Sequence, residues 1–257
     1  MFCGWAGQAS IPQRRKCTPV SCNYIYMEKN LDWDITSNRF VAFFDIMGFK
    51  NIVERHTHTQ VLERLTLLKR TLTDLAKIHE NKKFDFVKDK LSQTKAITFS
   101  DSIIVFSKSD TVQDACKIMM DSLYIIQKSI SINTGIKGAI AYGEITVDFN
   151  NSLFFGQPII DAYLFHEQLN LYTAVLDNTF EKKVNEFSLP NPFKNLIVDY
   201  KANFKSGKIK HKLIRPDDQK KINAQISGLE NMYTTVAGNP RIYIDNTLDF
   251  LNSLLEK

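Results

Sequence analysis

Length, composition and charge define the broad class of this chain and exclude two kinds of protein. The 257 residues are 44% hydrophobic and 24% charged, which is typical of one soluble globular domain with or without appendages. No apolar run approaches the roughly 20 residues that a bilayer-spanning helix needs, and a net charge of +5 is too diffuse to predict DNA or RNA as a partner.

The first residues differ in character from the rest of the chain. Residues 1–26 are rich in Cys, Pro, Gly, Ser and Arg, lack periodicity and contain no apolar core of signal-peptide length. They hold three of the four cysteines, whose spacing matches no common zinc pattern, so a reduced, cytoplasmic protein is expected. This segment is expected to be either a disordered tail or an upstream extension, with Met27 as the real start. The domain proper is predicted over residues 27–187, with 188–257 as a C-terminal elaboration packed on it.

Two stretches each place one aspartate beside a run of strand-forming residues. Residues 39–50, RFVAFFDIMGFK, contain a short apolar strand at 40–44 that Asp45 follows at once. Residues 97–106, ITFSDSIIVF, read as two strand arms joined by a turn around Asp101. A charged residue at the end of a strand is poorly placed for packing and well placed to bind a metal ion.

Helical and strand periods predict the remaining elements in order. After the first strand come helices at 49–55 and 57–79, the 97–106 hairpin, a helix at 111–131 capped by Asp110, and a strand at 136–147. A strand at 153–155, a helix from 156 to 168, a strand at 171–176 and a short helix capped by Asn178 follow. The chain ends with a hairpin of strands 196–200 and 210–214, then helices at 217–233 and 243–255.

This order predicts an α+β fold of the split βαβ, or ferredoxin-like, kind. A right-handed crossover makes the first two strands parallel, and the hairpin makes the third antiparallel to both. Strands one and three are neighbours about 5 Å apart in this fold. Asp45 and Asp101, distant in the sequence, are therefore expected side by side on one edge of the sheet.

Two adjacent carboxylates repel each other unless a cation lies between them. A hard divalent ion suits such a site, and two ions fit when a triphosphate is bound, one activating a hydroxyl nucleophile and one neutralising the leaving phosphates. Residues 47–50 run from strand into helix, and their backbone N–H groups are candidates for binding phosphate.

Four motifs in order resemble the class III nucleotidyl cyclase domain over roughly residues 39–177. The segments FFDIMGF at 43–49 and FSDS at 99–102 resemble the two metal motifs of that family. The segments GAIAYGE at 138–144 and FGQPIIDA at 155–162 resemble the strand and the helix entry that follow.

The resemblance implies a set of ligands, cofactors and partners. Two divalent cations, Mn²⁺ or Mg²⁺, would bind Asp45 and Asp101, with the carbonyl oxygen of Ile46 as a further ligand. The family also forms a head-to-tail homodimer with active sites at the interface. The predicted substrate contacts are Phe44, Gly48, Phe49, Lys50, Lys137 and Asp161.

This chain departs from the purine cyclases of the family at positions that read the base and stabilise the transition state. The base-reading lysine is replaced by Ile97, and the second base-reading residue by Leu153. The transition-state Asn and Arg correspond to Asp161 and Phe165. With these losses the chain resembles the pyrimidine cyclases of the Pycsar antiphage system, which make cyclic UMP or cyclic CMP from UTP or CTP for a separate effector protein. UTP is the preferred expectation.

Some predicted roles have a second interpretation. Lys137 is a candidate for stabilising transition-state charge, beside Lys50 and Arg55, although a surface lysine at a strand end is the preferred interpretation. Asp161 either orients the ribose or only caps its helix, and core packing is preferred to base contact for Phe44. The alternatives for the whole chain are a cyclase-like domain that binds nucleotide without turnover and a divergent adenylate cyclase.

Overall fold

A computed structural model describes residues 33–78, 93–234 and 236–256. Asp34–Lys257 form one compact unit. The predicted N-terminal extension at 1–26 and the question of Met27 as a start lie outside the described residues. No helix in the described ranges is both long enough and apolar enough to cross a lipid bilayer.

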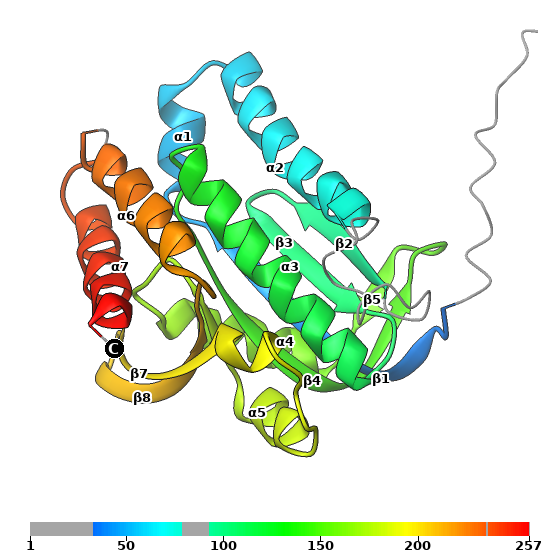
Figure 1. The fold of residues 1–257 in the computed structure, drawn as a ribbon. Coiled ribbons are helices and arrows are strands. Elements are labelled where there is room, and N and C mark those ends of the chain that lie inside the picture. The colour runs from blue at the N-terminus through cyan, green and yellow to red at the C-terminus, as the bar shows by residue number, and fades with distance from the viewer. Residues whose placement is uncertain (1–32, 79–92, 235, 257) are drawn as a thin grey trace, which may run out of the picture. The chain divides into compact units, whose positions relative to one another are not determined.

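The first half of the unit alternates strands and helices as the sequence predicts (Figure 1). Its elements are β1 (Thr36–Ile46), α1 (Phe49–Arg55), α2 (His58–Ile78), β2 (Thr94–Phe99), β3 (Ser102–Ser107), α3 (Val112–Ser131) and β4 (Ile136–Asp148). The second half contains β5 (Leu153–Phe155), α4 (Gln157–Gln168), β6 (Ala174–Leu176), α5 (Asn178–Asn185), the 3-10 turn η2 (Phe193–Leu196), β7 (Ile197–Phe204), β8 (Gly207–Ile214), α6 (Gln219–Tyr233) and α7 (Pro240–Leu255).

All of these strands belong to a single sheet with the order β2-β3-β1-β4-β6-β8-β7, and β5 pairs with β4 beside this path. β3 is antiparallel to both β1 and β2, so β1 and β2 are parallel, as the crossover rule requires. The four strands β2, β3, β1 and β4 thus have the split βαβ arrangement, and the α+β prediction is confirmed.

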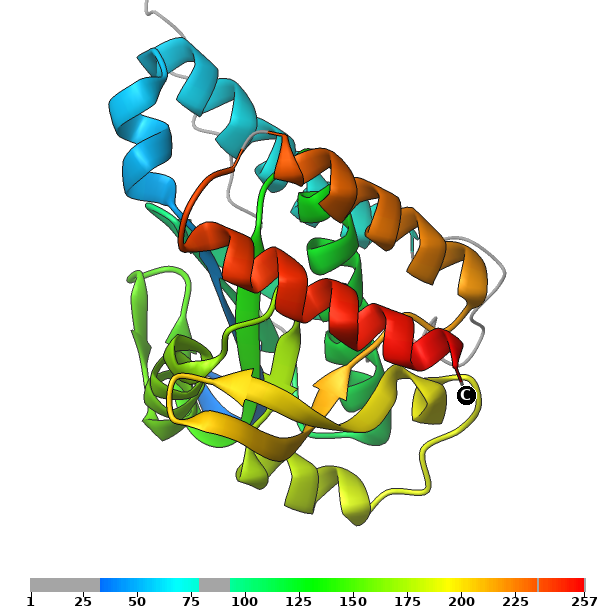
Figure 2. The same cartoon turned by 90° about the vertical axis from the view of Figure 1, so that its left-hand side faces the viewer.

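Helices cover both faces of the sheet (Figures 1 and 2). α2, α3, α6 and α7 follow one another in a layer on one face, and α4 lies on the opposite face against β1 and β4. β1 can pack on both layers because its central residues 40–44 are all apolar: Phe40, Ala42 and Phe44 are fully buried, and Phe43 contacts Tyr163 and His166 of α4.

A buried ion pair connects α3 to the edge strand β2. The Lys117 ammonium donates to the Asp121 carboxylate at 2.5 Å and to the Thr94 hydroxyl at 2.9 Å. Lys117 is 3% exposed and Asp121 is fully buried. Because buried charges are tolerated only when they are paired, this contact fixes the register of α3 against the sheet edge.

Several predicted element ends are wrong. α7 begins at Pro240 instead of Tyr243, and β7 and β8 are longer than the strands predicted at 196–200 and 210–214. At three other ends a side chain accepts from a backbone N–H. Thr111, not Asp110, caps α3: its hydroxyl accepts from the Asp114 N–H at 3.2 Å, while Asp110 accepts from the Tyr142 hydroxyl. Asp177, not Asn178, caps α5. β6 is shorter than predicted because the Tyr172 N–H donates to the Thr247 hydroxyl instead of a strand.

Candidate active site

The fold brings Asp45 and Asp101 to one edge of the sheet. Asp45 is opposite Ser102 in the β1–β3 ladder, and the next residue of β1, Ile46, donates its N–H to the carbonyl oxygen of Asp101 at 3.0 Å. Both aspartates are partly exposed. The predicted juxtaposition is therefore present, although Asp45 lies within β1 rather than after it, because the strand continues to Ile46.

The two carboxylates interact electrostatically. The pKa of Asp45 is raised to about 6, mainly by burial and in second place by the nearby Asp101. Lys137 acts in the opposite direction. A carboxyl group that is hard to ionise in the empty protein is one that a bound cation would stabilise as a carboxylate. Unfavourable ionisation of Asp45, next to a second carboxylate, is what is expected of a divalent-cation site without its metal.

Lys137 is not the surface lysine of the preferred sequence interpretation. It is 4% exposed and lies directly opposite Asp45 in the β1–β4 ladder. Its ammonium donates to the carbonyl oxygens of Glu167 at 3.2 Å and Leu169 at 3.1 Å, at the C-terminal end of α4. Because a helix end carries unsatisfied carbonyls and negative partial charge, it is a favourable place for a buried cation. Lys137 therefore uses two of its three N–H donors on α4 and brings its charge beside Asp45.

Burial lowers the pKa of Lys137 to about 8, with Lys205 contributing in the same direction and Asp45 and Glu167 opposing it. His166 lies in the same layer, 2% exposed and 4.9 Å from the Phe43 ring centre. Burial and Lys137 lower the pKa of His166 to about 4, so it is a neutral packing residue near neutral pH.

The loop after β1 carries the predicted phosphate contacts. Gly48 caps α1 in the left-handed conformation, with φ 73°, and a Cβ there would meet no atom within 4 Å, so the loop is open to solvent. Lys50 is exposed and pairs with Glu54 at 3.8 Å. These positions are accessible to a ligand beside Asp45.

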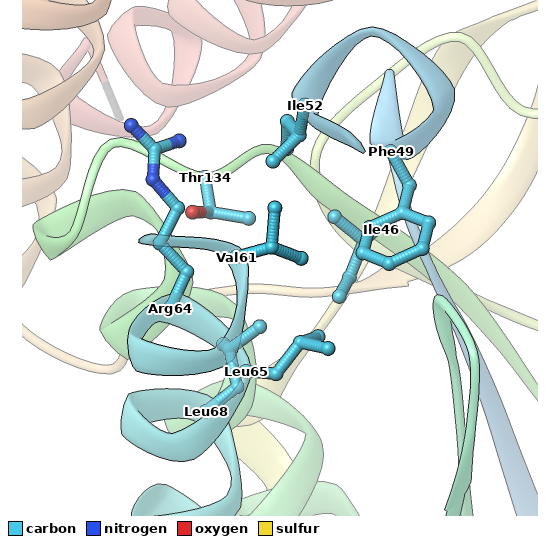
Figure 3. A pocket seen from close by; sticks show the side chains of 8 residues that line it. All are labelled: Ile46, Phe49, Ile52, Val61, Arg64, Leu65, Leu68 and Thr134. Carbon is cyan, nitrogen blue, oxygen red and sulfur yellow. The ribbon is translucent and has the colours of Figure 1, made fainter. Parts of the chain in front are cut away.

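The side chains of Ile46 and Phe49 point inward, away from this loop surface. Both line a small apolar pocket between α1 and α2 (Figure 3). The other lining residues are Ile52, Val61, Arg64, Leu65, Leu68 and Thr134. The Phe49 side chain thus serves the packing of α1, and the predicted contact of Phe49 with substrate stays a prediction about its backbone N–H. For Ile46 the predicted metal ligand is the carbonyl oxygen, which the packing of its side chain does not affect.

Two further predicted contacts have structural roles here. Phe44 is fully buried, and its ring would lie 2.4 Å from a Cβ on Gly138, so its side chain packs in the core, which is the preferred interpretation of the sequence. Asp161 does not cap α4: it lies one turn inside the helix and accepts from Gln157 at 2.8 Å.

The position that corresponds to the family arginine is part of an aromatic cluster. Phe165 stacks on Phe204 of β7 at 5.6 Å and meets His211 of β8 edge-on at 5.0 Å. This side chain anchors the β7–β8 hairpin to α4. A cation for the transition state would have to come from elsewhere.

The described residues contain no cluster of three or more His, Cys, Asp or Glu that would bind a metal without other ligands. A site of two carboxylates and one carbonyl leaves several positions of a six-coordinate ion for water or phosphate oxygens, which is how Mg²⁺ commonly binds in nucleotide sites. The donor set therefore fits a cation that arrives with a polyphosphate.

Comparison with known proteins identifies the fold. No family model matches the sequence, and no curated protein matches it. Among solved structures, the chain is similar to the catalytic core of a rhodopsin-guanylyl cyclase with converted specificity in complex with ATPαS, with a TM-score of 0.52 and 14% identity over 69% of this chain and 94% of that one. The guanylate cyclase domain of RhGC from Catenaria anguillulae in complex with GTP gives a TM-score of 0.50 and 14% identity over 70% of this chain and 96% of that one.

These likenesses establish the class of fold. The chain has the class III nucleotide cyclase fold, as the motifs predict. At 14% identity the comparison shows the fold alone and leaves the chemistry to the residues of this chain.

Sequence reasoning missed two neighbours of Asp45, Glu167 and Tyr243, and also missed that Lys137 is buried. After burial, Glu167 contributes to raising the pKa of Asp45, and Asp45 contributes in the same way to raising that of Tyr243. Glu167 and Tyr243 come from α4 and α7, more than a hundred residues away, so no local spacing could indicate them.

Proposed function

We propose that this protein is a metal-dependent pyrimidine nucleotide cyclase that converts UTP, or less readily CTP, to the 3′,5′-cyclic monophosphate and pyrophosphate. The observation that carries the proposal is the pair Asp45 and Asp101 on one sheet edge of a cyclase fold, with burial and the neighbouring carboxylate opposing ionisation of Asp45. Few structural roles explain two such carboxylates at an open edge.

Asp45, Asp101 and the carbonyl of Ile46 would hold the cations, Mn²⁺ or Mg²⁺. When bound, such ions lower the pKa of a hydroxyl nucleophile and neutralise phosphate charge. Around them the protein supplies fixed groups: the backbone at Gly48 and Phe49 with Lys50 for the phosphates, and the buried charge of Lys137 beside Asp45. Fixed charges in a partly buried site stabilise a developing negative charge more effectively than mobile water does.

The proposed pyrimidine preference rests on what stands at the base-reading positions. Ile97 lies on β2 and Leu153 on β5, and neither can donate or accept a hydrogen bond to a purine edge. A site that reads a base by hydrogen bonds rejects analogues lacking them, whereas an apolar one is permissive. The hydrogen bonds that select a purine are therefore missing, and the resemblance of the motifs to the Pycsar pyrimidine cyclases is what favours UTP or CTP. Antiphage signalling through cyclic UMP or cyclic CMP, in the cytoplasm and through a separate effector, is the proposed role.

We place the interface of the proposed homodimer at the outer face of α4 and the adjoining β5. Apolar side chains on this surface are exposed by 43–59%: Leu153, Phe155, Ile160, Tyr163 and Leu164. Ile160, Tyr163 and Leu164 have the i, i+3, i+4 spacing of one helix face. Exposed apolar side chains that gather on one helix face are typical of a protein contact.

A direct assay tests the activity. Purified protein is incubated with each of ATP, GTP, UTP and CTP in Mn²⁺ or Mg²⁺, and products are identified by mass. Asp45→Ala and Asp101→Ala are each expected to abolish the cyclic product without loss of fold. Asp199→Ala is the matched control, since Asp199 is an aspartate on β7 at the far edge of the sheet. Activity that survives both site variants would refute the proposal.

A nucleotide-binding domain without turnover is the second candidate. It is favoured by Phe165, which fills the position of the family arginine with an aromatic packing contact. Binding of a triphosphate with no cyclic product from any of the four nucleotides would select it. Product from ATP alone would select the divergent adenylate cyclase.

A further inference from the structure

The C-terminal helix α7 reaches the candidate site through Tyr243. The Tyr243 ring stacks on Tyr172 at 5.7 Å with planes 15° apart. The ammonium of Lys137 lies 5.5 Å from the centre of the same ring. Asp45 is close enough to contribute, after burial, to raising the pKa of the Tyr243 phenol. A side chain from the last helix thus borders the residues around Asp45.

Tyr172 links this ring to the loop that follows β1. Tyr172 is 2% exposed, and a Cβ on Gly135 would lie 2.3 Å from its ring, so the ring rests directly on the Gly135 backbone. The carbonyl oxygen of Gly135 accepts from the Met47 N–H at 2.9 Å. A continuous series of contacts therefore joins α7, through two stacked rings and a glycine, to the backbone two residues after Asp45.

Polar contacts hold α7 in place against the connection between α4 and β6. The Thr247 hydroxyl accepts from the Tyr172 N–H at 2.9 Å, and the Asn246 amide donates to the Asn170 carbonyl at 2.9 Å and accepts from Asn203. Lys137 binds the carbonyls of Glu167 and Leu169 at the start of this same connection. Side chains of α7 and β4 thus both bond to the backbone of this one short segment.

We propose that α7 is part of the catalytic centre and that Tyr243 is a positioning residue, which holds Lys137 and the strand end carrying Asp45 in their working geometry. The inference rests on the proposed function and deepens it. A ring over a cation contributes attraction that is largest where water is excluded, and stacking adds to it, so the aromatic ring, and not its hydroxyl, is the acting group.

Three variants of the full chain test this role. Tyr243→Leu removes the ring, Tyr243→Phe retains it, and Phe187→Leu is the matched control, because the Phe187 ring also lies under a cation, Lys183, at 5.4 Å but makes no part of α7 or of the site. We expect Tyr243→Leu to lower kcat on the order of tenfold with little change in KM, and to weaken Mn²⁺ binding measured by electron paramagnetic resonance. Tyr243→Phe and Phe187→Leu should stay within about twofold of wild type.

The outcomes separate this inference from the proposed function. A wild-type protein that makes no cyclic product would refute the function, while the Mn²⁺ affinities of the same variants would still decide the role of Tyr243. A folded Tyr243→Leu protein with wild-type kcat and Mn²⁺ affinity overturns the inference, and so does a Phe variant as impaired as the Leu variant. Should Tyr243→Leu not fold, Asn246→Ala, which loosens α7 from Asn170, is expected to lower kcat and Mn²⁺ affinity in the same way, and wild-type values for it would overturn the inference.

Discussion

Replacing Asp45 by asparagine should make the metal-free protein more stable while removing its metal site. The folded state raises the pKa of Asp45 from 3.8 to about 6, through burial first and then through Asp101. Ionising this group therefore costs free energy that the unfolded chain does not incur. Asparagine has nearly the same shape and carries no charge, so the variant should avoid the cost.

The size of the effect follows from the pKa difference. About 2 pKa units correspond to about 3 kcal/mol at 1.36 kcal/mol per unit. Asp45 is partly exposed, and solvent screening reduces the figure to roughly 1–2 kcal/mol. Because the folded state binds the proton more tightly, the cost is absent well below pH 3.8, grows as the pH rises toward 6, and is complete above that value.

Urea unfolding in EDTA measures this directly. At about pH 8 the Asn variant should exceed wild type by the full amount, and at about pH 4.5 the gain should fall to about a third. Added Mg²⁺ or Mn²⁺ should stabilise wild type and not the variant. The exposed Asp199→Asn serves as control and should change stability by less than about 0.5 kcal/mol. An Asn variant no more stable than wild type at the higher pH, or a gain independent of pH, would refute the reasoning.

Three other substitutions test the packing and the proposed interface. Gly135→Ala should lose about 1–3 kcal/mol in thermal melts, since its Cβ would lie 2.3 Å from the Tyr172 ring, and an unchanged Tm would mean that this ring is free to move. Lys117→Met removes the buried cation beside Asp121 and should lower the free energy of unfolding, measured in urea, by about 3 kcal/mol. An unchanged free energy would show that the ion pair does not contribute to stability. Leu164→Asp should give a folded monomer by light scattering, and a persistent dimer would place the interface elsewhere.

The sequence predicts the fold well because its signals are local. The helix at Phe49–Arg55 and the strand at Leu153–Phe155 have the predicted bounds, since each is bordered by glycine or turn residues. The order of strands and helices indicates the split βαβ fold, and the strand order and crossover hand of that fold make β3 a neighbour of β1. This brings Asp45 to the turn that holds Asp101.

The surroundings of the site could not be predicted in the same way. Lys137 has the sequence context of an exposed strand end, and only the arrival of the α4 end buries it. Tyr243 belongs to the interior pattern of a terminal helix, and nothing near it in the chain indicates a partner on β4. Such contacts depend on how the helices pack against the sheet. The hydrophobic periodicity of the sequence predicts the helices but not their packing partners.

The position of β1 has a consequence for how this protein acquires its chemistry. Asp45 pairs with Ser102 and Lys137 in the two ladders of β1. Its charge also interacts with Glu167 and Tyr243. Contacts spanning so much of the sequence form late and slowly, since long loops must close before they stabilise anything. A chain still emerging from the ribosome would thus lack a complete candidate site until α7 is released. Fragments that end before α7 should show no activity.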